Sequence, residues 1–245
     1  MSEDNEAAAL AAHTVSSYDE ELEFLTRRIA EMGGLAERMV EQSVAALVQG
    51  DEALSQKVIS DDVVLDDAER QVDEKAVLVI AKRQPMASDL RVIIGSIRIA
   101  ADLERIGDMA KNIAKRVIAV QGTAQPKKLV RGLEHLSELA LTQLKEVLDA
   151  YSTRSAELAN TVRDRDEEID AIYTSLFREL LTYMMEDPRN IAACTHLLFC
   201  AKNIERIGDH TTNIAETVYY ITTGSQLVAE RPKDDETAVM ALQED

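Results

Sequence analysis

The chain has 245 residues, of which 46% are apolar, enough for a sizeable core in one or two domains. It contains only 9 glycines and 4 prolines, a composition that favours long helices and excludes an all-β fold. The 45 acidic residues outnumber the 27 basic ones, and the resulting net charge of −18 opposes binding to nucleic acid, whose backbone attracts cations.

Several features predict a cytoplasmic protein. The longest stretch without charged side chains, Thr217–Ala229, is shorter than the ~20 apolar residues that a membrane-spanning helix needs. The N-terminus is acidic where a secretory signal is basic. Cys194 and Cys200 are six residues apart on a predicted helix, so they point away from each other and form no local disulfide.

Apolar residues recur three and four positions apart in six blocks, which predict six amphipathic helices. In helix one this seam includes Leu25, Ile29 and Met32, and Gly50-Asp51 predicts its end and the next N-cap. The double glycine Gly33-Gly34 inside this helix predicts a kink or a close helix contact. The predicted helices lie at about 17–49, 52–84, 89–120, 127–153, 157–186 and 190–222.

An internal repeat organises these helices. The segment DLERIGDMAKNIAKRV at 102–117 matches NIERIGDHTTNIAETV at 203–218 at nine of sixteen positions, with a constant offset of 101. Upstream, DVVLD at 62–66 matches DEEID at 166–170. We therefore expect an all-α fold of two tandem three-helix bundles, at 15–122 and 123–224, with flexible tails at 1–14 and 225–245.

The helix at 89–120 has two nearly opposite seams. One seam is apolar in both repeats and predicts the core. Its members are Ile99, Leu103, Ile106, Ala110, Ile113 and Val117, with the counterparts Cys200, Ile204, Ile207, Thr211, Ile214 and Val218. The other seam turns acidic midway, at Glu104 and Asp108, and the second repeat has Glu205 and Asp209 at these positions.

Helical rise predicts that each of these acidic pairs meets a second pair on the preceding helix. In an antiparallel hairpin the two pairs lie within ~6 Å of the same level in the first repeat and ~4.5 Å in the second. Two groups of four carboxylates result. The first acidic cluster comprises Asp62, Asp66, Glu104 and Asp108, and the second acidic cluster comprises Asp166, Asp170, Glu205 and Asp209.

Four carboxylates so close together need metal ions, basic side chains or protonation, because two charges 4 Å apart repel by ~4 kcal/mol at an effective dielectric of 20. Arg105 and Arg206 follow the glutamates but point about 100° away, so they make poor sole partners. Carboxylate oxygens suit Mg²⁺, Mn²⁺, Ca²⁺ or iron, and no repeated His or Cys indicates a closed zinc site. Metal binding is therefore the preferred interpretation.

Other candidate residues rank lower because the repeat does not preserve them. Glu69 and Asp73 extend the acidic column but become Tyr173 and Phe177 in the second repeat. His210 corresponds to Met109, so it is not counted among the ligands. The chain has no glycine-rich phosphate loop, nucleophile elbow or Ser/His/Asp order, which leaves little support for catalysis.

The sequence resembles the PhoU family over residues 15–222. The resemblance rests on LERIGD at 103–108, IERIGD at 204–209, the trailing NIA at 112–114 and 213–215, and the paired acids. It implies metal ions on the two acidic clusters, with iron, manganese, magnesium and zinc as the candidate metals.

The resemblance also implies a cytoplasmic negative regulator of phosphate uptake and of the phosphate-starvation response. Such a regulator couples a phosphate ABC transporter, through its ATPase, to a sensor histidine kinase, and a homodimer is expected. Because the chain is strongly acidic, we expect it to reach the membrane only through protein partners.

Two alternatives from other functional classes remain at this stage. A carboxylate-bridged di-metal enzyme is one, although the Glu-x-x-His pairs of ferritin-like sites do not occur on the matching helices. In the other, the acids form a helical docking scaffold for a basic partner. Titration with Mn²⁺ or iron separates the scaffold from a metal-binding protein.

Overall fold

The computed structural model describes residues 3–122 and 126–227, with side chains from residue 17 onward. Within these ranges the chain is helical and has no β-strand, so the predicted all-α class is confirmed. The helices are α1 (Glu3–Gln49), α2 (Glu52–Arg83), α3 (Ala87–Ala119), α4 (Lys127–Thr153), α5 (Ala156–Asp164), α6 (Asp166–Glu186), the short 3₁₀ turn η1 (Pro188–Asn190) and α7 (Ile191–Thr223).

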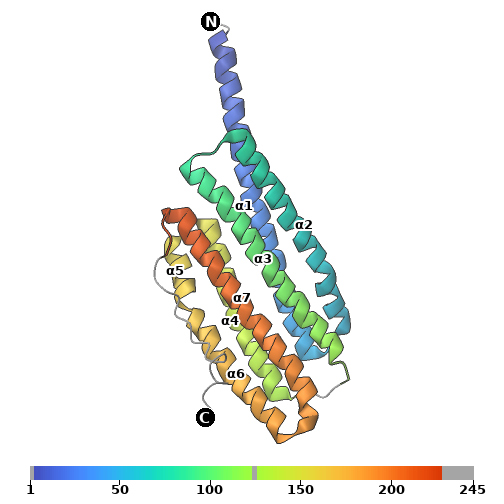
Figure 1. The fold of residues 1–245 in the computed structure, drawn as a ribbon. Coiled ribbons are helices and arrows are strands. Elements are labelled where there is room, and N and C mark those ends of the chain that lie inside the picture. The colour runs from blue at the N-terminus through green and yellow to red at the C-terminus, as the bar shows by residue number, and fades with distance from the viewer. Residues whose placement is uncertain (1–2, 123–125, 228–245) are drawn as a thin grey trace.

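The helices form two bundles that lie side by side (Figure 1). Helices α1, α2 and α3 pack on one another, and α4, α5, α6 and α7 form the second group. The main contact between the two groups joins α3 to α7, and α1 also contacts α4. Helices α3 and α7 run antiparallel, so the two repeated segments meet in the middle of the molecule (Figure 1).

The predicted core seams are buried in both repeats. All twelve members of the paired seams on α3 and α7 are at most 3% exposed. The α1 seam is also buried at Leu25, Ile29 and Met32, and both cysteines are buried and free. Apart from the buried polar Thr211, these residues belong to one hydrophobic core that is continuous across the two bundles.

Turns and caps follow the sequence signals closely. Asp51 caps α2, because its side chain accepts a hydrogen bond of 2.9 Å from the Leu54 amide. The double glycine of α1 serves a close helix contact, since a Cβ at Gly33 would lie 2.5 Å from Leu148 of α4. The C-terminal end of α7 is closed by Gly224 in the left-handed conformation.

The limits of two helices differ from the sequence prediction. Helix α1 begins at Glu3 rather than near residue 17, because its alanine-rich N-terminal sequence has high helix propensity. It therefore includes most of the segment expected as an N-terminal tail. Of the tail expected at 225–245, residues 228–245 lie outside the described residues.

The helix predicted at 157–186 is interrupted at Arg165, which divides it into α5 and α6. The side-chain amide of Gln143, on α4, donates a hydrogen bond of 2.9 Å to the Arg165 carbonyl. A side chain that enters the backbone hydrogen-bond ladder in this way breaks a helix. Asp166 consequently stands at the first position of α6, whereas Asp62 lies in the interior of α2.

Among the described residues, no helix combines the length and the apolar character that a bilayer crossing demands.

Candidate metal centres

A glycine in each repeat brings the acid-bearing helices close together. Gly107 of α3 faces Leu65 of α2, and a Cβ at Gly107 would clash with the Leu65 side chain. The equivalent Gly208 of α7 faces Ile169 of α6, where an added Cβ would lie 2.8 Å from the isoleucine Cδ1. Each of these four residues directly precedes an acid of a cluster, so the close approach also sets the distance between the acidic pairs.

The first acidic cluster is held together by Lys111 of α3. Its Nζ donates to Asp62 Oδ2 at 2.5 Å and lies 2.6 Å from Asp108 Oδ1. The lysine side chain is 20% exposed and the Asp62 side chain 7%. Burial favours the neutral form of Lys111, but the hydrogen bonds to Asp108 and Asp62 outweigh it and raise its pKa.

Arg105 supplies a second, weaker cation to the first cluster. Contrary to the expectation that it points away, its side chain bends back to 3.4 Å from Glu104 Oε2 and 3.4 Å from Asp108 Oδ2. The reason is the length and flexibility of the arginine side chain, which periodicity does not take into account. Because this side chain is 58% exposed, solvent screens both ion pairs.

The remaining carboxylates of the first cluster repel one another. Burial, and next the charge of Asp108, raise the pKa of Glu104 to about 7. Burial and the neighbouring charge of Asp62 likewise raise the pKa of Asp66, and Asp108 adds to this shift across the helix pair. The four predicted residues therefore lie within electrostatic reach of one another.

The second acidic cluster is more deeply buried. Asp166, Asp170 and Glu205 are 3–6% exposed. The Thr212 hydroxyl donates to Asp166 Oδ1 at 2.9 Å, and Lys202 Nζ lies 2.8 Å from Glu205 Oε1. Within this cluster, Glu205 lies within electrostatic reach of Asp209 and Asp170.

Glu205 has the features expected of an oxygen ligand. Burial raises its pKa, and the charges of Asp209 and Asp170 add to the increase while Lys202 opposes it. Its Oε2 atom is buried and has no hydrogen-bond partner in the described part of the chain. A buried carboxylate oxygen in this state is stabilised by a cation, and an all-carboxylate donor set suits hard metal ions, so the residues fit the implied metal.

In the conformation described, no group of three or more His, Cys, Asp or Glu side chains in the described ranges is arranged to hold one ion. In the first cluster an ammonium group lies between two of the acids instead. Metal binding there therefore requires the Lys111 side chain to move.

Sequence reasoning missed Lys111 and Thr212, although each follows the motif aspartate by three residues, one helical turn. It also placed Glu69 outside the site, whereas the charge of Glu69 contributes to the raised pKa of Glu104. His210 lies away from the second cluster, with its Nδ1 2.9 Å from Asp102 Oδ1 of α3.

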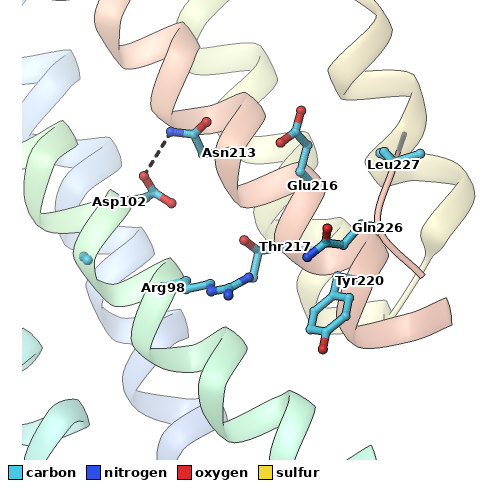
Figure 2. Close-up of a pocket in the computed structure, with 9 residues that line it drawn as sticks. Arg98, Asp102, Asn213, Glu216, Thr217, Tyr220, Gln226 and Leu227 are labelled. Carbon is cyan, nitrogen blue, oxygen red and sulfur yellow. Dashed lines mark hydrogen bonds between the residues drawn. The ribbon is translucent and has the colours of Figure 1, made fainter. Parts of the chain in front are cut away.

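A separate pocket of about 510 Å³ lies between α3 and α7, where the two bundles meet (Figure 2). Arg98 and Asp102 of α3 face Asn213, Thr217 and Tyr220 of α7 across it (Figure 2). The Asn213 amide donates to Asp102 at 3.3 Å, so the pocket wall includes polar contacts between the bundles. None of the eight predicted acids lines this pocket.

The fold and the sites together define a class of duplicated helical-bundle proteins that carry one four-acid cluster in each repeat. The model of the PhoU domain matches the chain twice, at residues 29–117 and 133–218. The two matches cover the two repeats, and the chain belongs to the PhoU family.

Individual relatives agree with this assignment. A phosphate-specific transport system accessory protein PhoU homologue from Rhizobium meliloti (strain 1021) is 75% identical over 94% of this chain and 97% of its own length. A protein of the same description from Caulobacter vibrioides is 49% identical over 92% of this chain and 98% of its own.

Solved structures of the family have the same fold. The crystal structure of PhoU from Pseudomonas aeruginosa superposes with a TM-score of 0.82 at 39% identity, covering 85% of this chain and all of that one. The phosphate transport system regulatory protein PhoU from Streptococcus pneumoniae gives a TM-score of 0.80 at 27% identity, covering 86% of this chain and all of that one.

Proposed function

We propose that this protein is a cytoplasmic accessory regulator of phosphate transport that represses phosphate uptake and the phosphate-starvation response. The observation that carries the proposal is the 75% identity, over nearly the whole of both chains, to a phosphate-specific transport system accessory protein. The partners proposed are the ATPase of a phosphate ABC transporter and a sensor histidine kinase, and the active form proposed is a homodimer. The protein acts by binding rather than by catalysis.

Metal ions on the two acidic clusters form the second part of the proposal. It is supported by the hard-oxygen donor set, by mutual repulsion among the acids, and by the buried Oε2 atom of Glu205. The proposed ligands of the first site are Asp62, Asp66, Glu104 and Asp108. Those of the second site are Asp166, Asp170, Glu205 and Asp209.

A bound metal ion would neutralise the acids and would supply attraction between the two helices of a hairpin. An ion could link the two helices in this way because each site contains one acidic pair from the earlier helix and one from the later helix. Iron, manganese, magnesium and zinc all remain candidates, and a site without cysteine or histidine favours the harder ions.

The metal proposal is tested by elemental analysis of protein purified without chelators and without a metal-affinity column. The variant Glu104→Gln/Asp108→Asn keeps the size of both side chains and should remove metal from the first site alone. The matched variant Glu205→Gln/Asp209→Asn should remove metal from the second site alone. Metal content that is unchanged in both variants contradicts the assignment.

The regulatory proposal is tested by deleting the gene and measuring a phosphate-starvation reporter in phosphate-rich medium. We expect derepression in the deletion strain, restored repression with the wild-type gene, and recovery of the transporter ATPase or the kinase in pull-downs. Unaltered reporter expression contradicts the regulatory role, and tight binding of the purified protein to anionic liposomes contradicts membrane recruitment through partners.

A further inference from the structure

The two repeats place different side chains at one equivalent position beside the acids. Lys111 of α3 and Thr212 of α7 are related by the repeat offset of 101. Each reaches the first of the two cluster acids on the preceding helix, Lys111 at 2.5 Å from Asp62 and Thr212 at 2.9 Å from Asp166. The contact is thus conserved between the repeats, but one repeat makes it with an ammonium group and the other with a neutral hydroxyl.

The ammonium group of Lys111 lies where a metal ion would have to bind. It contacts Asp62 from α2 and Asp108 from α3, two of the four acids of the first cluster. A lysine that is 20% exposed and bound to two carboxylates is held more firmly than an exposed surface lysine. A metal ion that binds both acids must therefore displace this group.

In the second cluster, the lysine contacts a different acid of the set. Lys202 lies 2.8 Å from Glu205 Oε1, with a side chain that is 41% exposed, and its repeat counterpart is Ala101. Thr212 is fully buried and adds no charge at Asp166. The equivalent position occupied by Lys111 in the first repeat and by Thr212 in the second is called position 111/212. Its side chain contacts the equivalent aspartate in both repeats, but it is charged only in the first.

We propose that Lys111 is an intramolecular cation that competes with metal for Asp62 and Asp108, so that position 111/212 sets the metal affinity of each cluster. This inference rests on the metal binding proposed above. Groups beside metal ligands commonly change metal affinity by about 10–100-fold. We expect Lys111→Thr to tighten metal binding at the first cluster by at least about tenfold, and Thr212→Lys to weaken it at the second by a similar factor.

The test measures Mn²⁺ binding one cluster at a time, by isothermal titration calorimetry and by electron paramagnetic resonance of free Mn²⁺. The first cluster is measured in the Glu205→Gln/Asp209→Asn background, with Lys111→Thr and Lys111→Arg. The second cluster is measured in the Glu104→Gln/Asp108→Asn background, with Thr212→Lys. Circular dichroism checks that each variant folds, and the Lys111 variants decide the result if a buried lysine at 212 prevents folding.

Lys115 provides a matched control, because it is exposed on the same helix one turn further on. Lys115→Thr removes the same charge from the chain without touching the cluster. Tighter Mn²⁺ binding in Lys111→Thr but not in Lys115→Thr or Lys111→Arg supports the inference. Equal affinities for Lys111→Thr and Lys115→Thr overturn it while leaving metal binding intact, whereas absence of Mn²⁺ binding in every variant and in the wild type overturns the metal proposal itself.

Discussion

Gly107 shows why a helix motif contains a residue of low helix propensity. Glycine destabilises a helix interior by about 0.5–1 kcal/mol relative to alanine, so its presence needs a compensating contact. Here that contact is the Leu65 side chain of the neighbouring helix, and the same arrangement recurs between Gly208 and Ile169. The motif glycine therefore belongs to the packing that brings the acids together.

Gly107→Ala should lower the free energy of unfolding by about 1–2 kcal/mol, because overpacking costs about 1–3 kcal/mol and exceeds the gain in helix propensity. Thermal unfolding followed by circular dichroism measures the change. Gly34→Ala is the control, since the nearest atom to its added Cβ is the mobile end of Arg38 at 3.5 Å. It should raise stability by about 0.5–1 kcal/mol, and equal effects of the two substitutions would contradict this account.

Glu21 links α1 to α2 through ion pairs with Arg83 at 2.9 Å and Lys75 at 3.3 Å. Burial alone would raise the pKa of Glu21, but the hydrogen bonds from Arg83 and Lys75 outweigh it and lower the pKa. Because the folded-state pKa lies below the unfolded one, this stabilisation is present above about pH 4.3 and is lost as the pH falls through the folded pKa.

Glu21→Gln should therefore lower the free energy of unfolding by about 1 kcal/mol at pH 7, and the difference from wild type should vanish in acid. Urea titrations at several pH values measure this dependence. Glu23→Gln changes the net charge equally at an exposed position and should have little effect. If the difference in the free energy of unfolding between the wild type and Glu21→Gln stays constant from pH 7 to pH 3, the ion pairs do not stabilise the fold.

At the level of elements, the break between α5 and α6 distinguishes the second repeat from the first. Helix α2 continues through its acidic pair, whereas α6 begins at Asp166. The cause is a contact with another helix, since the side-chain amide of Gln143 on α4 donates a hydrogen bond to the Arg165 carbonyl. The acids of the second repeat are therefore positioned by α4 as well as by their own hairpin.

Gln143→Leu should destabilise the protein by about 1 kcal/mol, because the Arg165 carbonyl loses its side-chain donor. The loss stays modest because leucine also removes the buried Gln143 Oε1, which has no hydrogen-bond partner in the described part of the chain. Urea unfolding measures the difference, and Gln56→Leu on exposed α2 surface should change stability by less than about 0.5 kcal/mol. If Gln143→Leu is as stable as the wild type, this hydrogen bond does not stabilise the interruption between α5 and α6.

At the level of the whole molecule, the two repeats are parts of one folded body. Their largest mutual contact is between α3 and α7, and the buried core continues across it. Polar contacts reinforce this interface, since Asp102 of α3 accepts a hydrogen bond from Asn213 and lies 2.9 Å from His210. Gly95 of α3 lies against Ile221 and Thr217 of α7, so the third helices of the two repeats cover part of each other's surface.

We therefore expect the two repeats to unfold together. Native-state hydrogen exchange at increasing urea concentration should give the same free energy of opening for core amides of α3 and of α7. The internal control is the α1 segment before residue 17, which projects beyond the bundle and should exchange through local opening (Figure 1). Exchange that occurs in α7 at a much lower free energy than in α3 would reveal two independent units.

Helical periodicity was enough to predict which faces of the helices are buried and which carry acids, because it assigns each residue to a face without reference to distant contacts. The internal repeat extended this to a prediction that the eight acids form two groups. Both steps rely on spacing along the chain, which the helices preserve. The PhoU resemblance found in the motifs also agrees with the family match.

Contacts that depend on side-chain reach and on helices distant in sequence could be known only from the folded molecule. Arg105 turns toward the first cluster because its long, flexible side chain leaves the face that periodicity assigns to its Cβ atom, and Lys111, which already lies on the acidic face, reaches across to Asp62 of α2. The break at Arg165 depends on Gln143, more than 20 residues earlier in the chain. The packing of the two repeats on each other likewise depends on the shape complementarity of α3 and α7, which no local sequence pattern predicts.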